Sequence, residues 1–268
     1  MICSMMLIPL GDTAGKILGT QYGLHPFFIA FTRFGLGLLL LLPFTKKIDP
    51  RVLLDPRMWL RGFFITAGIA CILTALKTEP IGNVYAIFFI GPILSFFASV
   101  ILLKEPFSKA RAALLGLGFI GVLLVVRPTQ DIGIGAIFAL MAGTFYGSFL
   151  VASRWLSGYA HPFSLIFSQM AVGTLFLAII GLPQANTLSL EMAPWILLSA
   201  WASGLGNILL VFAYQRAEAT KLAPFVYIQL IAASLFGFVV WGDLPDMIAC
   251  LGILLLLGSG LSTYFLRK

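Results

Sequence analysis

The stretch NVYAIFFIGPILSFFASVILL, residues Asn83–Leu103, contains no charged side chain and is apolar almost throughout. The hydrocarbon core of a bilayer is about 30 Å thick, and a helix needs about 20 residues to cross it. Nine further stretches of similar character lie on either side of this one, joined by short connections. The sequence therefore predicts ten membrane-spanning helices: Ile2–Gln21, Pro26–Phe44, Met58–Lys77, Asn83–Leu103, Ala110–Val126, Gly133–Trp155, Pro162–Leu182, Ala193–Tyr214, Lys221–Trp241 and Met247–Phe265.

The composition of the whole chain agrees with an all-α integral membrane protein. Hydrophobic residues make up 60% of the 268 residues, and charged residues make up only 10%. Soluble domains average about 25% charged residues, so the sequence excludes a hidden water-exposed domain. We interpret the three cysteines (Cys3, Cys71 and Cys250) as small buried hydrophobic residues without disulfides.

Basic residues are distributed unevenly between the predicted connections. With a cytoplasmic N-terminus, thirteen Lys and Arg residues fall on the inner side and two, Lys77 and Arg127, on the outer side. Positive charge favours cytoplasmic loops, so we predict a bacterial inner-membrane protein with both termini in the cytoplasm. This bias also explains the net charge of +7 without a nucleic-acid partner. The thirteen residues are Lys46, Lys47, Arg51, Arg57, Arg61, Lys104, Lys109, Arg111, Arg154, Arg216, Lys221, Arg267 and Lys268.

An internal repeat divides the chain into two halves. The motif His-Pro-Phe begins at His25 and again at His161, 136 residues later, and Glu105 and Asp243 follow apolar runs at a separation of 138. Each half holds five predicted helices, an odd number, so the second half must enter the membrane from the opposite side. We predict two inverted five-helix repeats, residues 1–130 and 131–268. Secondary transporters often have this architecture, with the substrate site at mid-membrane between the repeats. Chance similarity among apolar helices is the alternative explanation.

The order of motifs along the chain resembles the drug/metabolite transporter superfamily with EamA-type domains. The resemblance implies ten helices around a central cavity and the transport of small organic metabolites, and it leaves the substrate and the direction open. It covers nearly the whole chain and is weaker in the second half. It rests on LGDTAGKIL (10–18), HPFFIAFTRFGLG (25–37), AIFFIGPILSFFASVILLKEPFS (86–108), GFIGVLLVVRP (118–128) and VWGDLPDMIACLGILLLLGSG (240–260).

Three charged side chains, Asp12, Lys16 and Arg33, lie well inside predicted helices. A charge at the centre of a membrane costs about 2.5–3.5 kcal/mol on insertion scales, so we expect all three to face the interior. Asp12 and Lys16 are one helical turn apart, in the order that favours pairing, which would leave Arg33 to attract an anionic group of a substrate. A fixed structural network is the alternative. Asp12 is also the candidate for proton coupling, because burial can raise a carboxyl pKa toward neutrality.

The internal repeat shows which residues of the second half correspond to these three charged residues. It aligns Asp12, Lys16 and Arg33 with uncharged residues, so the predicted cavity is electrostatically asymmetric. Arg33 aligns with Gln169, and we therefore expect glutamine to be tolerated at position 33.

Aromatic, phenolic and amide side chains complete the predicted substrate site. Interhelical packing and hydrogen bonding are the alternatives for each of them. Gly91 and Pro92 are interpreted as a hinge, because proline removes a backbone hydrogen bond. The predicted substrate-binding residues, in addition to the three charged ones, are Tyr85, Phe88, Phe89, Tyr146, Asn207, Tyr227 and Gln229.

These features predict a secondary transporter that moves a small organic metabolite by alternating access. An amino acid, an amino-acid derivative or a cofactor precursor with an anionic group would suit the predicted site. The sequence carries no phosphate-binding loop, histidine cluster or nucleophile motif, so no catalytic residue, metal or cofactor is predicted. A passive channel and a membrane-embedded lipid-modifying enzyme are the alternatives. Glycines in Leu115–Gly121 and Leu251–Gly260 suggest close helix contacts, within a monomer or between the subunits of a homodimer.

Overall fold

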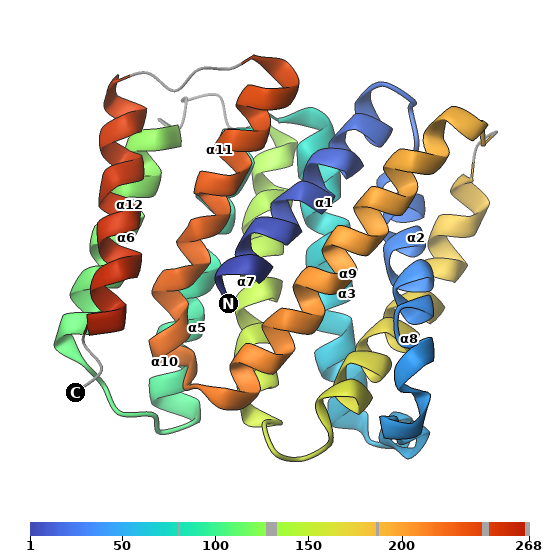
Figure 1. The fold of residues 1–268 in the computed structure, drawn as a ribbon, viewed down its shortest axis with the longest axis horizontal. Coiled ribbons are helices and arrows are strands. Elements are labelled where there is room, and N and C mark those ends of the chain that lie inside the picture. Colours follow the sequence, from blue (N-terminus) through green and yellow to red (C-terminus); the bar gives the residue numbers. More distant parts are fainter. Residues whose placement is uncertain (80, 127–132, 186–187, 243–246, 266–268) are drawn as a thin grey trace.

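The computed structural model describes residues 1–79, 81–126, 133–185, 188–242 and 247–265. Throughout these residues the secondary structure is helical, and no strand occurs in them. The helices lie side by side in a bundle (Figure 1). Four of them are long and apolar enough to cross a membrane by length and composition, and shorter apolar helices accompany them.

The helices follow the predicted apolar stretches closely, with three exceptions. The second predicted helix, Pro26–Phe44, ends early as α2 at Leu39 and is followed by the 3-10 helix η1. The fourth predicted helix is broken into α4 and α5, and the ninth into α10, η5 and α11. The helices are α1 (Ile2–Thr20), α2 (Pro26–Leu39), α3 (Pro56–Thr78), α4 (Ile81–Phe88), α5 (Ile90–Leu102), α6 (Lys109–Val126), α7 (Ile134–Trp155), α8 (Pro162–Gly181), α9 (Ala193–Arg216), α10 (Ala219–Leu222), α11 (Ile228–Trp241) and α12 (Met247–Phe265). Short 3-10 helices are η1 (Leu42–Lys47), η2 (Pro50–Leu54), η3 (Leu182–Gln184), η4 (Leu190–Met192) and η5 (Ala223–Tyr227).

Pro92 explains the break between α4 and α5. Proline has no N–H to bond the carbonyl group of Phe88 four residues earlier, and its ring crowds that carbonyl. The helix is interrupted at Phe89, and the Phe88 carbonyl lies against Gly143 of α7, where an added Cβ would collide with it. A Cβ added at Gly147 would lie 2.6 Å from the carbonyl oxygen of Gly91. The broken helix and α7 therefore approach backbone to backbone, as small residues allow in membrane helices.

The two His-Pro-Phe motifs start helices in the same way. His25 and His161 are the N-caps of α2 and α8, and Nδ1 of each accepts a hydrogen bond of 3.3 Å from the backbone N–H two residues later. The proline that follows is the first helical residue, where an N–H would have no helical partner. The repeated sequence therefore produces repeated local structure.

Helices from the first part of the chain pack against helices from the second. The pairs are α1 with α9, α3 with α7, α2 with α8, α6 with α12, α5 with α7 and α1 with α11. The α6–α12 pair forms one side of the bundle (Figure 1). Because the two parts interleave, side chains from both surround the centre of the molecule.

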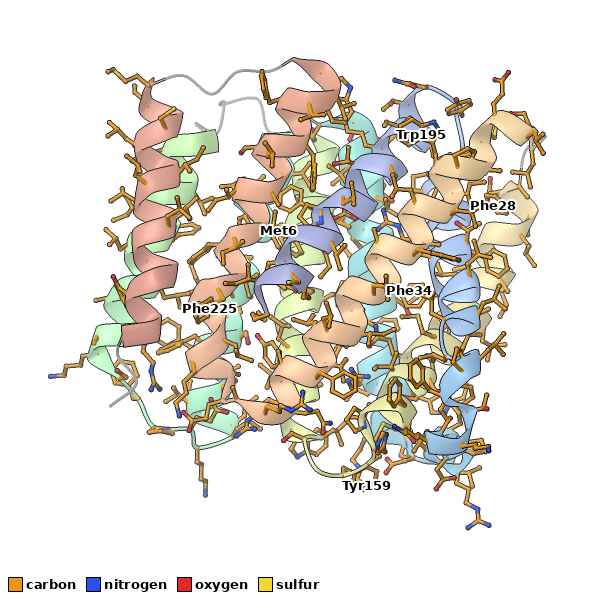
Figure 2. All side chains as sticks on the ribbon, viewed as in Figure 1. Met6, Phe28, Phe34, Tyr159, Trp195 and Phe225 are labelled. Atoms are coloured by element: carbon orange, nitrogen blue, oxygen red, sulfur yellow. The ribbon has the colours of Figure 1, made fainter. Side chains whose placement is uncertain are left out.

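One end of the bundle, the lower end in Figure 1, gathers the connections that carry most of the basic residues. We call it the basic end. The connections are α2–α3 with η1 and η2, α5–α6, α7–α8 and α9–α10. Nitrogen-tipped side chains gather mainly there, whereas the flanks of the bundle are mostly carbon (Figure 2). Ile179 and Val239, for example, are each 70% exposed, as expected for a surface that contacts lipid.

The structure corrects two expectations about individual residues. Arg61 does not belong to a connection, because it lies inside α3 and is fully buried. Twelve of the thirteen predicted inner basic residues therefore remain candidates, although Arg267 and Lys268, like Arg127 and Asp243, lie outside the described residues. Cys71 is buried as predicted, but Cys3 and Cys250 are exposed. That prediction was wrong because an apolar helix face can meet lipid as well as protein.

Candidate functional site

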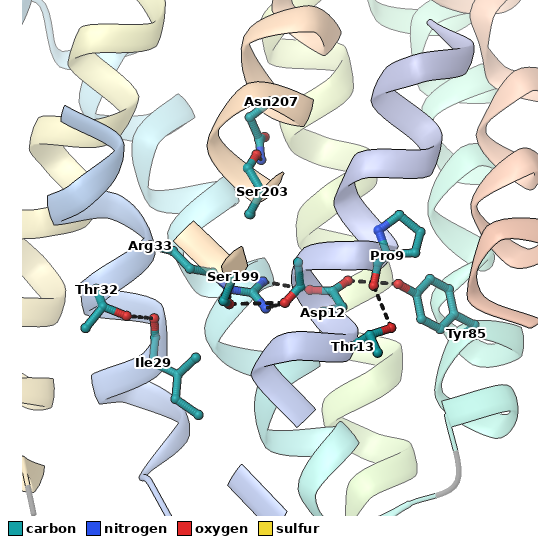
Figure 3. Close-up of polar contacts among 11 residues, drawn as sticks. Pro9, Asp12, Thr13, Ile29, Thr32, Arg33, Tyr85, Ser199, Ser203 and Asn207 are labelled. Carbon is teal, nitrogen blue, oxygen red and sulfur yellow. Dashed lines mark hydrogen bonds and ion pairs between the residues drawn. The ribbon is translucent and has the colours of Figure 1, made fainter. Parts of the chain in front are cut away.

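A buried ion pair joins α1 to α2 deep inside the bundle (Figure 3). Nη1 of Arg33 donates to Oδ1 of Asp12 at 2.6 Å, and both side chains are almost fully buried. The other guanidinium nitrogens donate to the carbonyl oxygen of Gly11 at 2.7 Å and to Oγ of Ser199 at 2.9 Å. The hydroxyl of Tyr85 donates to Oδ2 of Asp12 at 2.8 Å. Side chains and backbone from α1, α2, α4 and α9 thus meet at one pair of charges.

The predicted pairing of Asp12 with Lys16 was wrong. Lys16 is half-buried, and its Nζ lies 5.5 Å from the ring centroid of Trp241. Arg33 reaches Asp12 instead, because its planar fork can satisfy three acceptors at once. Gly15 leaves the space for it, since a Cβ there would lie 2.5 Å from Nη2 of Arg33. Arg33 is therefore neutralised and cannot be the surplus cation.

A small cavity lies beside this ion pair. Its volume of about 30 Å³ is room for roughly two water molecules, so in this conformation it is too small to hold an organic metabolite. The cavity brings together six of the predicted substrate-binding residues. These are Asp12, Arg33, Phe88, Tyr146, Asn207 and Gln229, and Ile8, Ile65, Gly68, Ile69, Ile72 and Ser203 complete the lining.

The polar groups of the lining are only partly satisfied by one another. Nε2 of Gln229 donates to the hydroxyl of Tyr146 at 3.4 Å, and Nε2 of Gln169 donates to Oδ1 of Asn207 at the same distance. Oε1 of Gln229 has no hydrogen-bond partner among the described residues. Phe88 packs on Tyr146 with ring centroids 5.0 Å apart. The cavity wall therefore offers an aromatic surface, amides and a free acceptor.

The remaining predicted residues do not line the cavity. Phe89 and Tyr227 are buried and pack against each other with ring centroids 5.4 Å apart, and the Tyr227 hydroxyl donates to the carbonyl of Leu115 at 3.1 Å. Tyr85 reaches the site through Asp12 and through Phe88, whose ring centroid lies 6.0 Å from its own. Gly91 and Pro92, at the start of α5, take part in the close contact with α7. In this conformation these residues pack the helices.

Arg61 is the residue of the site that the sequence reasoning missed. Its guanidinium donates to Oγ of Ser153 at 3.0 Å, to the carbonyl of Leu165 at 2.9 Å and to Oε1 of Gln169 at 3.1 Å. It also lies 4.7 Å from the ring centroid of Phe149. All these partners are neutral, and no carboxylate in the described part of the chain forms an ion pair with Arg61.

The position of Arg61 in the sequence made its burial difficult to predict. It lies five residues after the start of α3, where an arginine is easily counted as an anchor at the membrane surface. Two hydrogen bonds instead connect it to the cavity: Arg61 donates to Gln169, and Gln169 donates to Asn207. The apolar residues on both sides of it in LRGFF were the available signal.

Polar contacts close the basic end between the two parts of the chain. Oε1 of Glu105 accepts from Nε of Arg154 at 2.9 Å and from the backbone N–H of Ala219 at 3.2 Å. The Tyr159 hydroxyl donates to Asp55, and hydrogen bonds from Arg57 and Tyr159 hold the pKa of Asp55 well below its usual range. Glu105 thus pins the α5–α6 connection to α7 and α10.

The described residues contain no group of three His, Cys, Asp or Glu side chains placed to hold a metal ion. The site is thus built from one ion pair, one further buried cation, two amides and aromatic rings. Such groups bind and orient a ligand.

Comparisons with known proteins give the family. The profile of the EamA-like transporter family matches residues 1–127 and again residues 133–265. An S-adenosylmethionine uptake transporter of Rickettsia prowazekii is 24% identical, over 100% of this chain and 92% of that protein. A riboflavin transporter of Brucella anthropi is 26% identical, over 96% of this chain and 93% of that protein. A solved crystal structure with 16% identity covers 99% of both chains at a TM-score of 0.74, which shows a shared fold. This chain therefore belongs to the EamA-like transporter family and is a multi-pass integral membrane transporter, not an enzyme.

Proposed function

We propose that this protein is a secondary transporter that moves a small organic metabolite across a bacterial membrane by alternating access. Its relatives are named for S-adenosylmethionine uptake and riboflavin transport, and both compounds are small organic metabolites. The proposal depends mainly on the small central cavity, whose walls come from α1 to α4 on one side and from α7, α9 and α11 on the other. Secondary transporters with inverted repeats have their substrate site near mid-membrane, between the two repeats. A passive channel conducts through a continuous opening.

The proposal includes ten crossings in two inverted repeats, residues 1–130 and 131–268. Offsets of 136 to 138 residues relate α1 to α7, α2 to α8, α3 to α9, α4 and α5 to α10 and α11, and α6 to α12. Helix contacts then occur in related pairs: α1–α9 with α7–α3, α2–α9 with α8–α3, and α5–α7 with α11–α1. This pairing supports a two-fold relation around the cavity, so that one sequence pattern can pack in two nearly equal ways.

The same relation gives the two buried arginines equivalent surroundings. Arg33 corresponds to Gln169, and Arg61 corresponds to Ser199 at an offset of 138. Arg33 donates to Ser199 and Arg61 donates to Gln169, so the same two positions meet on both sides of the cavity. Asp12 neutralises Arg33. One positive charge remains on Arg61, and it favours a metabolite with an anionic group, such as a carboxylate.

A ligand screen by thermal shift tests the proposal directly. A ligand at a hundred times its dissociation constant adds about 2.7 kcal/mol to the stability of the folded state. We expect a metabolite with a carboxylate or phosphate to stabilise the purified protein and to exchange across proteoliposomes. Flux without saturation would favour a channel.

We expect cysteines at Lys47 and Gln184 to react with an impermeant maleimide from opposite sides of the membrane. Both positions are exposed, in η1 and η3, and the 136-residue offset places them at nearly equivalent positions of the two repeats. The positive-inside rule assigns Lys47 to the cytoplasm. Labelling in right-side-out and inverted vesicles measures the sidedness. Reaction of both cysteines from one side would contradict the inverted topology.

Asp12 remains the candidate for proton coupling, because it is the one acidic residue in the described cavity lining. To accept a proton it must lose its contact with Arg33, so protonation would depend on conformation. We expect Asp12→Asn to keep substrate exchange in proteoliposomes but to lose accumulation driven by a pH gradient. Arg33 would keep neutral acceptors in that variant, as Arg61 already does. Full pH-driven accumulation by the variant would move the proton site elsewhere.

A further inference from the structure

Three hydroxyl groups between the cavity and the basic end are fully buried and make no hydrogen bond of standard length to any residue that the structure describes. Ser95 and Ser99 on α5 and Tyr214 on α9 are each 0% exposed. At standard hydrogen-bond geometry none of the three finds a partner among these residues, although the hydroxyls of Tyr214 and Ser95 are close enough to influence each other. Native proteins rarely leave buried hydroxyls unsatisfied, because the loss of hydration is not repaid. Three at one location therefore indicate groups that a ligand or its water satisfies during the working cycle.

These three residues, which we call the hydroxyl track, start at the cavity. The Tyr214 hydroxyl lies near that of Ser95 and interacts electrostatically with Tyr146, and Tyr146 lines the cavity with Gln229. Oε1 of Gln229 in the cavity lining is one of three further buried polar atoms without a hydrogen-bond partner in the described part of the chain, with Nε2 of Gln215 and Oε2 of Glu218. The unsatisfied groups thus continue from the cavity wall into the track.

The track ends at Glu105. Ser99 lies one helical turn beyond Ser95 on α5, and its carbonyl oxygen accepts from the backbone N–H of Glu105 at 3.3 Å. The Glu105 carboxylate holds Arg154 and the backbone of Ala219, which ties the end of α5 to α7 and α10. In this conformation the track is therefore closed at the basic end.

The proposed equivalent positions in the other half carry no hydroxyl. At an offset of 138 residues, Ser95 and Ser99 correspond to Ala233 and Gly237 of α11, and Tyr214 corresponds to Leu76 of α3. All three are buried. Buried positions at these places thus occur without hydroxyl groups, and at Gly237 the space that a Cβ would take is open.

We propose that Ser95, Ser99 and Tyr214 line the half of the substrate path that joins the cavity to the basic end, and that Glu105 closes this half. The inference rests on the proposed transport function. The track is uncharged, so it suits hydroxyl and amide groups and the hydration water of a polar metabolite. The opposite half of the path, at Ala233 and Gly237, is apolar and would be hydrated less.

Single cysteines in a background without Cys3, Cys71 and Cys250 test the track. The probe is a small, charged methanethiosulfonate applied from the side of the basic end. We expect Ser95→Cys and Ser99→Cys to react, and the matched Ala233→Cys and Gly237→Cys to stay unreactive from that side. Glu105→Gln should raise the reaction rate of Ser99→Cys about tenfold, the effect of removing a closing contact worth about 1.4 kcal/mol.

Ser203→Cys in the cavity lining separates this inference from the proposed function. If Ser203→Cys reacts while the track cysteines react no faster than the Ala233 control, the track is overturned and the cavity remains accessible. If Ser203→Cys is unreactive from both sides, the proposed function fails as well.

Melting temperature gives a second readout. Ser95→Ala and Ser99→Ala should change it by no more than about a degree, because neither hydroxyl makes a hydrogen bond of standard length to a described residue. A fall of several degrees in either variant would assign these hydroxyls to structure and overturn the proposal.

Discussion

Arg33→Gln is expected to remove most of the folded protein. The substitution leaves the carboxylate of Asp12 buried, with the Tyr85 hydroxyl as its one remaining side-chain partner among the described residues. Stranding one member of a buried ion pair costs about 3–5 kcal/mol, which is a large share of a total stability of about 5–15 kcal/mol. The yield of monodisperse protein on size exclusion and the melting temperature measure the loss.

The expected loss revises an expectation drawn from the repeat. Gln169 is tolerated at the equivalent position, but its neighbour there is Arg61 rather than an acid. The double variant Asp12→Asn with Arg33→Gln removes both charges and should recover much of the folded yield. A coupling of the two substitutions up to about 3 kcal/mol is expected for residues in direct contact. Additive losses would show that the pair does not hold α1 and α2 together.

Arg61→Gln is expected to leave the protein folded and to weaken binding of an anionic metabolite about tenfold or more. No acidic side chain in the described residues forms an ion pair with Arg61, so its removal leaves no buried negative charge without a partner. A unit charge near a site acts with about 1–4 kcal/mol at short range and an effective dielectric near 20. Thermal-shift titration measures the dissociation constant, and the melting temperature without ligand reports folding.

Two control variants separate the effect of the charge of Arg61 from the effect of its location in the protein. Arg61→Lys keeps the charge but loses the planar fork, so it should retain part of the affinity. Arg57→Gln removes an arginine whose side chain is 41% exposed and paired with Asp55, and it should change binding little. A loss of folded protein on Arg61→Gln as large as that on Arg33→Gln would make Arg61 a structural residue.

The helices and the cavity residues were predictable for physical reasons. The thickness of the bilayer sets the length of an apolar helix, so predicted and observed bounds such as those of α7 agree within a residue or two. Polar side chains in such helices must face the interior, and for this reason Asp12, Asn207 and Gln229 reach one cavity. Pro92 gave the signal for the break at Phe89.

The ion-pair partner of Asp12 and the burial of Arg61 were not predictable in the same way. Local spacing favours Asp12 with Lys16, but the crossing of α1 with α2 and α9 places Arg33 closer. Which residues share a crossing depends on tertiary packing, and local spacing carries no information about it. The depth of Arg61 was hidden by its position near the start of α3.

Alternating access through the cavity is the central claim, and paired distance measurements at the two ends test it most directly. Spin labels at Lys109 and Arg216 report the basic end, and labels at Gln21 and Gly242 report the opposite end; all four positions are exposed. The distances give the fraction of molecules that is open at each end. Alternating access predicts that these two fractions add up to one or less and that they change in opposite directions when the metabolite is added. Simultaneous opening of both ends, or flux with no change at either end, would contradict it.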